Sequence, residues 1–153
     1  MEQNLRPQMT IGGLIRALRA AECDTDATLQ WDFLTMGVYP GGSYRGFYDQ
    51  YALEYGPLNP SDPREQKQRL ATPADLARHL EGAIGQWYTG WKGGEYMMLD
   101  ETPVWVGNPG ESHDMGVVGV RVVAPYLVVL ETRFVDPSES HYWTERIVRV
   151  IAR

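Results

Sequence analysis

The chain has 153 residues, of which 43% are hydrophobic, with a net charge of −6 and an isoelectric point near 5.0. This length fits one domain that can bury a core without disulfides or a metal ion. The acidic balance argues against a general nucleic-acid binder, which needs a basic surface to neutralise phosphates. A small anionic ligand stays possible, because a local pocket on an acidic protein can be basic.

Cysteine content and hydropathy bear on where the protein works. Cys23 is the only cysteine, so no internal disulfide can form, and a reducing compartment is indicated. The first residues are polar, and no apolar run is long enough to cross a bilayer. We therefore expect a cytoplasmic protein that does not enter the membrane.

Two helices are predicted from capping residues and apolar periodicity. The first spans Ile11–Ala21 with Thr10 as its cap. The second spans Pro73–Gln86, with Thr72 as N-cap and Gly90 as the left-handed residue that ends it. A faint likeness between the openings of the two helices, and between the aromatic strands that follow, is too weak to indicate a repeat.

The remaining elements are predicted as strands separated by turns. Met36–Gly46 is expected to be a loop, and so is Gly56–Arg64, whose prolines disfavour a regular element. Alternating apolar residues and turn signals predict strands at Thr28–Leu34, Phe47–Tyr55, Tyr96–Leu99, Thr102–Val106, Val117–Val123, Tyr126–Val135 and Tyr142–Ile151. The pattern as a whole predicts an α+β fold in which two helices pack on a mainly antiparallel sheet in a single domain.

A first candidate binding segment is Ser43–Tyr48. Its glycine neighbours let the backbone turn tightly or approach a ligand. Arg45 offers a planar fork for phosphate or carboxylate, and Tyr44 and Tyr48 offer rings and hydroxyls. The alternative is a hairpin loop whose tyrosines cover the edge of the core.

A second aromatic and basic segment spans Trp87–Tyr96. Trp91 and Tyr96 would stack on a base, and Lys92, one of only two lysines in the chain, would meet a phosphate. The alternative is a helix–strand corner whose aromatic rings pack into the core.

A third candidate lies in Pro103–Ser112. Trp105 alternates with two valines, so one face of this strand is expected to leave the core or to meet another subunit. Asn108 begins a turn and would stand at the rim of a pocket. The alternative is an ordinary strand and its turn.

Catalytic and metal-binding patterns are weak in this sequence. Ser112, His113 and Asp114 are consecutive, so their side chains diverge and cannot form one triad among themselves. No spacing typical of a zinc site, a phosphate loop or a dinucleotide fold is present. A metal site formed by His113, Asp114 and His141 is a minor alternative. We therefore predict no catalytic residues, no metal site and no cofactor.

Four stretches resemble a group of small proteins encoded by tailed bacteriophages, especially those of actinobacteria. They are TIGGLIRAL at Thr10–Leu18, SYRGFY at Ser43–Tyr48, GWKGGEYMM at Gly90–Met98 and TPVWV at Thr102–Val106. This resemblance implies a phage accessory protein and assigns no reaction. A small phage protein with aromatic and cationic residues in its predicted loops and no catalytic set is similar to the sponges of the Thoeris and CBASS systems. Those sponges sequester cyclic-nucleotide or cyclic ADP-ribose signals.

Three hypotheses follow from these features. The first is a homo-oligomeric protein that captures a small, anionic, nucleotide-like signal without cleaving it. The second is an interaction or inhibitor protein that grips another protein with the same aromatic segments. The third is a nucleotide-acting hydrolase that uses Glu111, His113 or Asp114 as acid or base.

Overall fold

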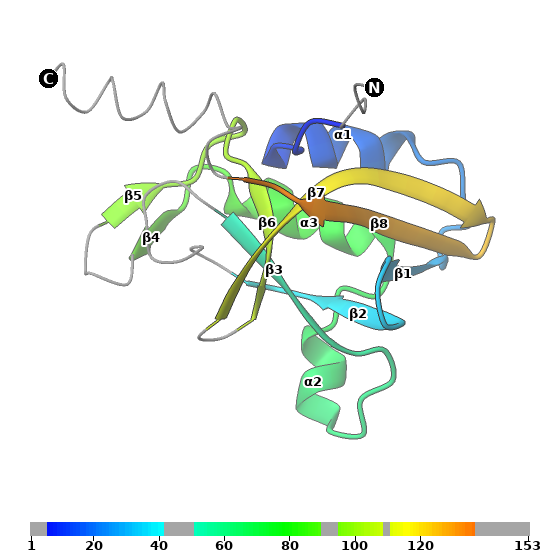
Figure 1. The fold of residues 1–153 in the computed structure, drawn as a ribbon. Coiled ribbons are helices and arrows are strands. Elements are labelled where there is room, and N and C mark those ends of the chain that lie inside the picture. The colour runs from blue at the N-terminus through cyan, green and yellow to red at the C-terminus, as the bar shows by residue number, and fades with distance from the viewer. Residues whose placement is uncertain (1–5, 42–50, 90–94, 109–110, 137–153) are drawn as a thin grey trace, which may run out of the picture.

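The computed structural model describes residues 6–41, 51–89, 95–108 and 111–136. The described residues form helices and strands in an α+β arrangement (Figure 1). The helices are α1 (Ile11–Ala20), α2 (Pro63–Gln68) and α3 (Pro73–Ala83). The strands are β1 (Thr28–Trp31), β2 (Met36–Tyr39), β3 (Tyr51–Pro57), β4 (Trp87–Thr89), β5 (Glu95–Met97), β6 (Val104–Asn108), β7 (Glu111–Ala124) and β8 (Leu127–Phe134).

Six of these strands close into a barrel in the order β1-β2-β3-β6-β7-β8, while β4 and β5 form a separate two-stranded hairpin. Four of the barrel pairings are antiparallel. The β3–β6 and β1–β8 pairings are parallel. A closed sheet has no free edge, so among the described strands only the β4–β5 hairpin has unpaired edges.

Helices α1 and α3 begin as the capping residues predict. The Thr10 side chain accepts a hydrogen bond from the Gly13 N–H at 3.0 Å. Thr72 and Asp75 form a complete capping box, in which each side chain accepts from the other residue's backbone N–H. These caps satisfy N–H groups that have no partner inside the helix. The two helices pack against each other over the barrel, as Figure 1 shows.

The main core joins the inner faces of α1 and α3 to the barrel strands. The helices contribute apolar residues spaced at three and four positions, which places them on one face. The largest fully buried side chains are Trp31, Trp105, Tyr51, Ile11, Leu14, Leu29, Leu53, Leu76, Leu80, Met98 and Leu130.

Two predicted loops contain regular structure, and those predictions are wrong. Met36–Tyr39 is strand β2, because both its neighbours in the barrel, β1 and β3, supply partners for its backbone. Within Gly56–Arg64, the proline spacing concealed a helix start. Asp62 caps α2 and Pro63 occupies its first turn, where the missing N–H costs nothing. Helix α2 buries none of its residues, so its sequence has no apolar stripe from which a helix could be predicted.

The second predicted helix ends earlier than expected. Helix α3 stops at Ala83, and Gly85, with φ of +86°, takes the left-handed conformation that we assigned to Gly90. The chain then enters β4, which the sequence pattern missed because this strand has only three residues. The hairpin predicted from Val117–Val123 and Tyr126–Val135 is confirmed as β7 and β8. The strand predicted at Tyr142–Ile151 lies outside the described residues.

The β1–β2 turn has an unusual composition. Leu34 and Thr35 both have positive φ, at 51° and 48°, and the Met36 N–H approaches the Phe33 carbonyl at 3.4 Å. Two successive left-handed residues are what a type I′ turn requires, and Asn-Gly is the usual pair there. This turn therefore holds a β-branched residue and a largely exposed leucine in a strained conformation.

Candidate functional site

Most of the predicted ligand-binding residues fall outside the described part of the chain. Tyr44, Arg45, Tyr48, Trp91 and Lys92 all lie there. The structure gives the backbone positions of two others, Tyr96 in β5 and Asn108 at the end of β6. The site is therefore built from the described residues that flank the two aromatic and basic segments.

Trp105 is the one predicted site residue whose side chain the structure describes. It is 1% exposed and packs in a small buried cluster with Ala52 and Val135. Its neighbours on the paired strands are Ala52 on β3 and Gly116 on β7. A ligand could reach this ring only by displacing that packing.

The elements that carry the two segments meet at one end of the barrel. Tyr51 opens β3 directly after segment 42–50, and Tyr88 lies in β4 just before segment 90–94. Their rings are in edge contact, with centroids 6.2 Å apart and planes at 87°. The Tyr51 N–H also donates to the Pro103 carbonyl at 3.3 Å, at the start of β6.

The parallel pairing of β3 with β6 explains this meeting. Parallel strands begin at the same end of a sheet, so the connections that enter them arrive side by side. Tyr51 and Val104, the first residues of β3 and β6, are register partners. The chain that enters β6 carries the β4–β5 hairpin, which Figure 1 shows beside the start of β3.

A tyrosine–histidine pair lies at this end of the barrel. The fully buried Tyr51 places its hydroxyl 2.7 Å from Nε2 of His79 on α3. Burial raises the pKa of Tyr51 well above its ordinary value, and the Tyr88 phenol adds to this effect. Burial also lowers the pKa of His79. Both groups are therefore neutral at pH 7, and one proton is shared in a hydrogen bond between them.

This hydrogen bond limits the proton transfer that Tyr51 and His79 themselves can perform. A general base needs a pKa close to the working pH and a free lone pair aimed at its substrate. The phenol of Tyr51 keeps its proton, and Nε2 of His79 is already engaged. The arrangement suits positioning and packing rather than proton transfer. The sequence gives no reason to pair His79 with Tyr51, because the two residues lie in a helix and in a distant strand.

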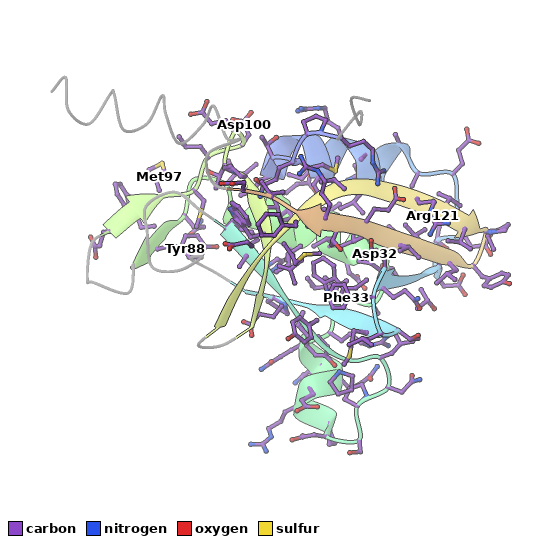
Figure 2. All side chains as sticks on the ribbon, viewed as in Figure 1. Asp32, Phe33, Tyr88, Met97, Asp100 and Arg121 are labelled. Carbon is purple, nitrogen blue, oxygen red and sulfur yellow. The ribbon has the colours of Figure 1, made fainter. Side chains whose placement is uncertain are left out.

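The hairpin next to this pair has two different faces. Tyr88 and Tyr96 are register partners, and Trp87 is paired with Met97. Because side chains alternate along a strand, Trp87 points away from the side on which Tyr88 meets Tyr51. Trp87 is 64% exposed. Figure 2 shows Tyr88 and Met97 on this hairpin, across the molecule from Arg121 on β7.

Other candidate chemistry finds little support in the described structure. Glu111, Ser112 and His113 belong to β7 by their backbone, and their side chains lie outside the description. Within residues 6–41, 51–89, 95–108 and 111–136, no three His, Cys, Asp or Glu side chains are placed to share a metal ion. No helix in these ranges is long and apolar enough to cross a bilayer.

Comparison with known proteins adds no family to this description. No family model matches the chain, and neither a curated protein nor a solved structure shows significant similarity to it.

Proposed function

We propose that this protein is a phage-encoded accessory protein that captures a small, anionic, nucleotide-like signal without cleaving it. The ligand class is a cyclic nucleotide or a cyclic ADP-ribose. Arg45 and Lys92 would meet its phosphates, and Tyr44, Tyr48, Trp91 and Tyr96 would stack on its bases.

The observation that carries this proposal is the contact between Tyr51 and Tyr88. These residues adjoin the two aromatic and basic segments along the chain, so both segments depart from one end of the barrel. A single ligand with a base and a phosphate needs rings and cations from both segments within reach of each other.

The test is binding followed by recovery of the ligand. The protein is mixed with cyclic dinucleotides, cyclic trinucleotides, isomers of cyclic ADP-ribose and linear ADP-ribose, and its melting temperature is measured. A ligand at about 100 times its Kd adds about 2.7 kcal/mol, which raises the melting temperature by roughly 5–10 °C. Heating the complex and separating its components should return the ligand unchanged. An altered ligand, or no shift with any compound, would refute sequestration.

The chain provides a matched control for the two proposed cations. Arg45→Ala combined with Lys92→Ala should abolish the shift. Arg64→Ala combined with Lys67→Ala removes the same charge from α2, whose residues are all unburied and which lies far from the β4–β5 hairpin in Figure 1. This control should bind normally, because a general loss of positive charge would weaken both variants equally.

A second candidate function is protein–protein interaction, and it is favoured by Trp87. This ring is 64% exposed on a hairpin whose outer strand edges are not paired within the described residues. Exposed aromatic residues of this kind are enriched in interfaces. Trp87→Arg should then abolish copurification of a protein partner, or assembly of the chain into a homo-oligomer, and leave ligand binding unchanged. A Trp87→Arg variant that keeps its partners would remove this candidate.

A further inference from the structure

The barrel consists of two three-stranded units with the same connectivity. Strands β1-β2-β3 form one antiparallel series, and β6-β7-β8 form another. The two series are joined by parallel pairs, β3 with β6 and β8 with β1. If β1, β2 and β3 are exchanged with β6, β7 and β8 in that order, every strand pairing and its direction stay the same. The closed barrel therefore has a topological two-fold relation between its halves.

The helix that precedes each series follows the same relation. Thr10 caps α1 and Thr72 caps α3, each by accepting from a backbone N–H three residues on. Counted from the caps, Leu14 and Leu18 of α1 correspond to Leu76 and Leu80 of α3. All four leucines are buried, and each helix carries an arginine between its pair, Arg16 and Arg78 respectively. The residues that end the helices, Ala21 and Ile84, have nearly the same backbone angles.

Hydrogen bonds cross between the halves in matching pairs. Before α1, the Met9 N–H donates to Val117 on β7 at 2.7 Å, and the Met9 carbonyl accepts from Val104 on β6 at 3.0 Å. Before α3, the Leu70 N–H donates to Val38 on β2, and the Ala71 carbonyl accepts from Leu29 on β1, both at 2.9 Å. The segment that leads into each helix is thus held by the first two strands of the other half.

We infer that the chain is a tandem duplication of one α-β-β-β unit. Its two halves are joined as two separate copies of such a unit would be joined in a dimer. A cap followed by spaced leucines is common in helices and would not suffice alone. Reciprocal exchange of the segments before both helices is a feature of paired subunits that swap elements. The same exchange would have no reason to recur in a chain whose halves arose separately.

The duplication also explains why unusual sequence gathers at one end. At the β1–β8 end, the α1–β1 connection and the β7–β8 turn are short, and they are hydrogen-bonded to each other. The Asp24 N–H donates to the Pro125 carbonyl, and the Thr28 N–H donates to the Tyr126 carbonyl. The equivalent connections at the β3–β6 end, between α3 and β6 and between β2 and β3, are much longer. One contains segment 42–50, and the other carries β4 and β5. One end of a symmetric scaffold has therefore been enlarged.

The inference is independent of the proposed ligand and is tested by circular permutation of the full chain. The Arg133 guanidinium donates to the Arg6 carbonyl at 2.8 Å, so the two described ends of the chain lie together. Arg153 is joined to Met1 by a glycine–serine linker, and the chain is opened between Pro60 and Ser61, where the halves meet. A matched control is opened between Pro125 and Tyr126, an exposed turn inside the second unit.

The first permutant keeps both units whole, so its urea midpoint should fall by less than about 0.5 M, while the control should lose more than about 1 M or its cooperativity. If the linker prevents the first permutant from folding, a second experiment uses the unpermuted chain. Protease sites are placed at the same two positions, and each chain is cut after folding, denatured and diluted. Fragments cut between the units should reassemble, and fragments cut inside the second unit should not. Equal behaviour of the two cuts overturns the duplication.

Discussion

Replacing Tyr51 with phenylalanine tests the hydrogen bond between Tyr51 and His79 directly. The substitution removes one atom, the hydroxyl oxygen that lies 2.7 Å from Nε2 of His79. The ring is fully buried and stays in place, since phenylalanine fills the same volume apart from that oxygen. The loss therefore reports the hydrogen bond rather than a cavity.

The magnitude follows from how each partner is surrounded. A neutral hydrogen bond contributes about 0.5–1.5 kcal/mol net, and a buried group left without a partner costs about 1–3 kcal/mol. His79 is only half-buried, so water can reach its ring and offset part of that cost. We expect Tyr51→Phe to lower the free energy of unfolding by about 1 kcal/mol. The melting temperature should fall by about 2–4 °C.

The assay is urea unfolding at pH 7.5, followed by tryptophan fluorescence, with Tyr126→Phe as the control. Tyr126 is 68% exposed, so its substitution should change the unfolding free energy by less than about 0.5 kcal/mol. A Tyr51→Phe variant as stable as the control would show that the hydroxyl contributes nothing. A loss above about 3 kcal/mol would indicate a rearranged core and equally refute the reasoning.

Three further outcomes are expected from the same structure. Burial lowers the pKa of His79, so the unfolded chain binds more protons than the folded protein. The free energy of unfolding should therefore fall as the pH drops below about 6.5, and His79→Gln should remove that part of the pH dependence. Leu34→Asn with Thr35→Gly should raise the urea-derived unfolding free energy by about 1 kcal/mol, because this pair tolerates both positive φ angles; a decrease would contradict the turn assignment. Thr10→Ala and Thr72→Ala should each cost about 1 kcal/mol by thermal unfolding, and markedly unequal losses would count against equivalent caps.

Local sequence signals were sufficient for the starts of both long helices. A threonine cap, a proline at the first position and leucines at helical spacing act within a few residues, so Thr72 and Pro73 identify the start of α3 without reference to any distant strand. The β7–β8 hairpin was equally readable, since its alternating valines flank a turn containing Pro125.

Short strands could not be read in this way. Met36–Tyr39 is a strand only because β1 and β3 lie on either side of it, and that depends on pairings between distant parts of the chain. The same limit applies to the candidate site. Tyr51, His79 and Tyr88 come from a strand, a helix and a hairpin, and no spacing along the sequence relates them. Trp105 shows the converse, because its alternation with valines fits a strand buried on both faces as well as one that faces a ligand.

The sequence by itself determined the α+β class, the caps of α1 and α3, and the aromatic and basic character of segments 42–50 and 90–94. Only the tertiary structure decided that the barrel closes, that its halves are related by a two-fold exchange, and that Tyr51 meets Tyr88. The physical reason is that propensity and capping are local, whereas closure depends on β1 pairing in parallel with β8 and β3 with β6. Those pairings bring together residues far apart along the chain, and they select the end of the barrel from which both candidate segments depart.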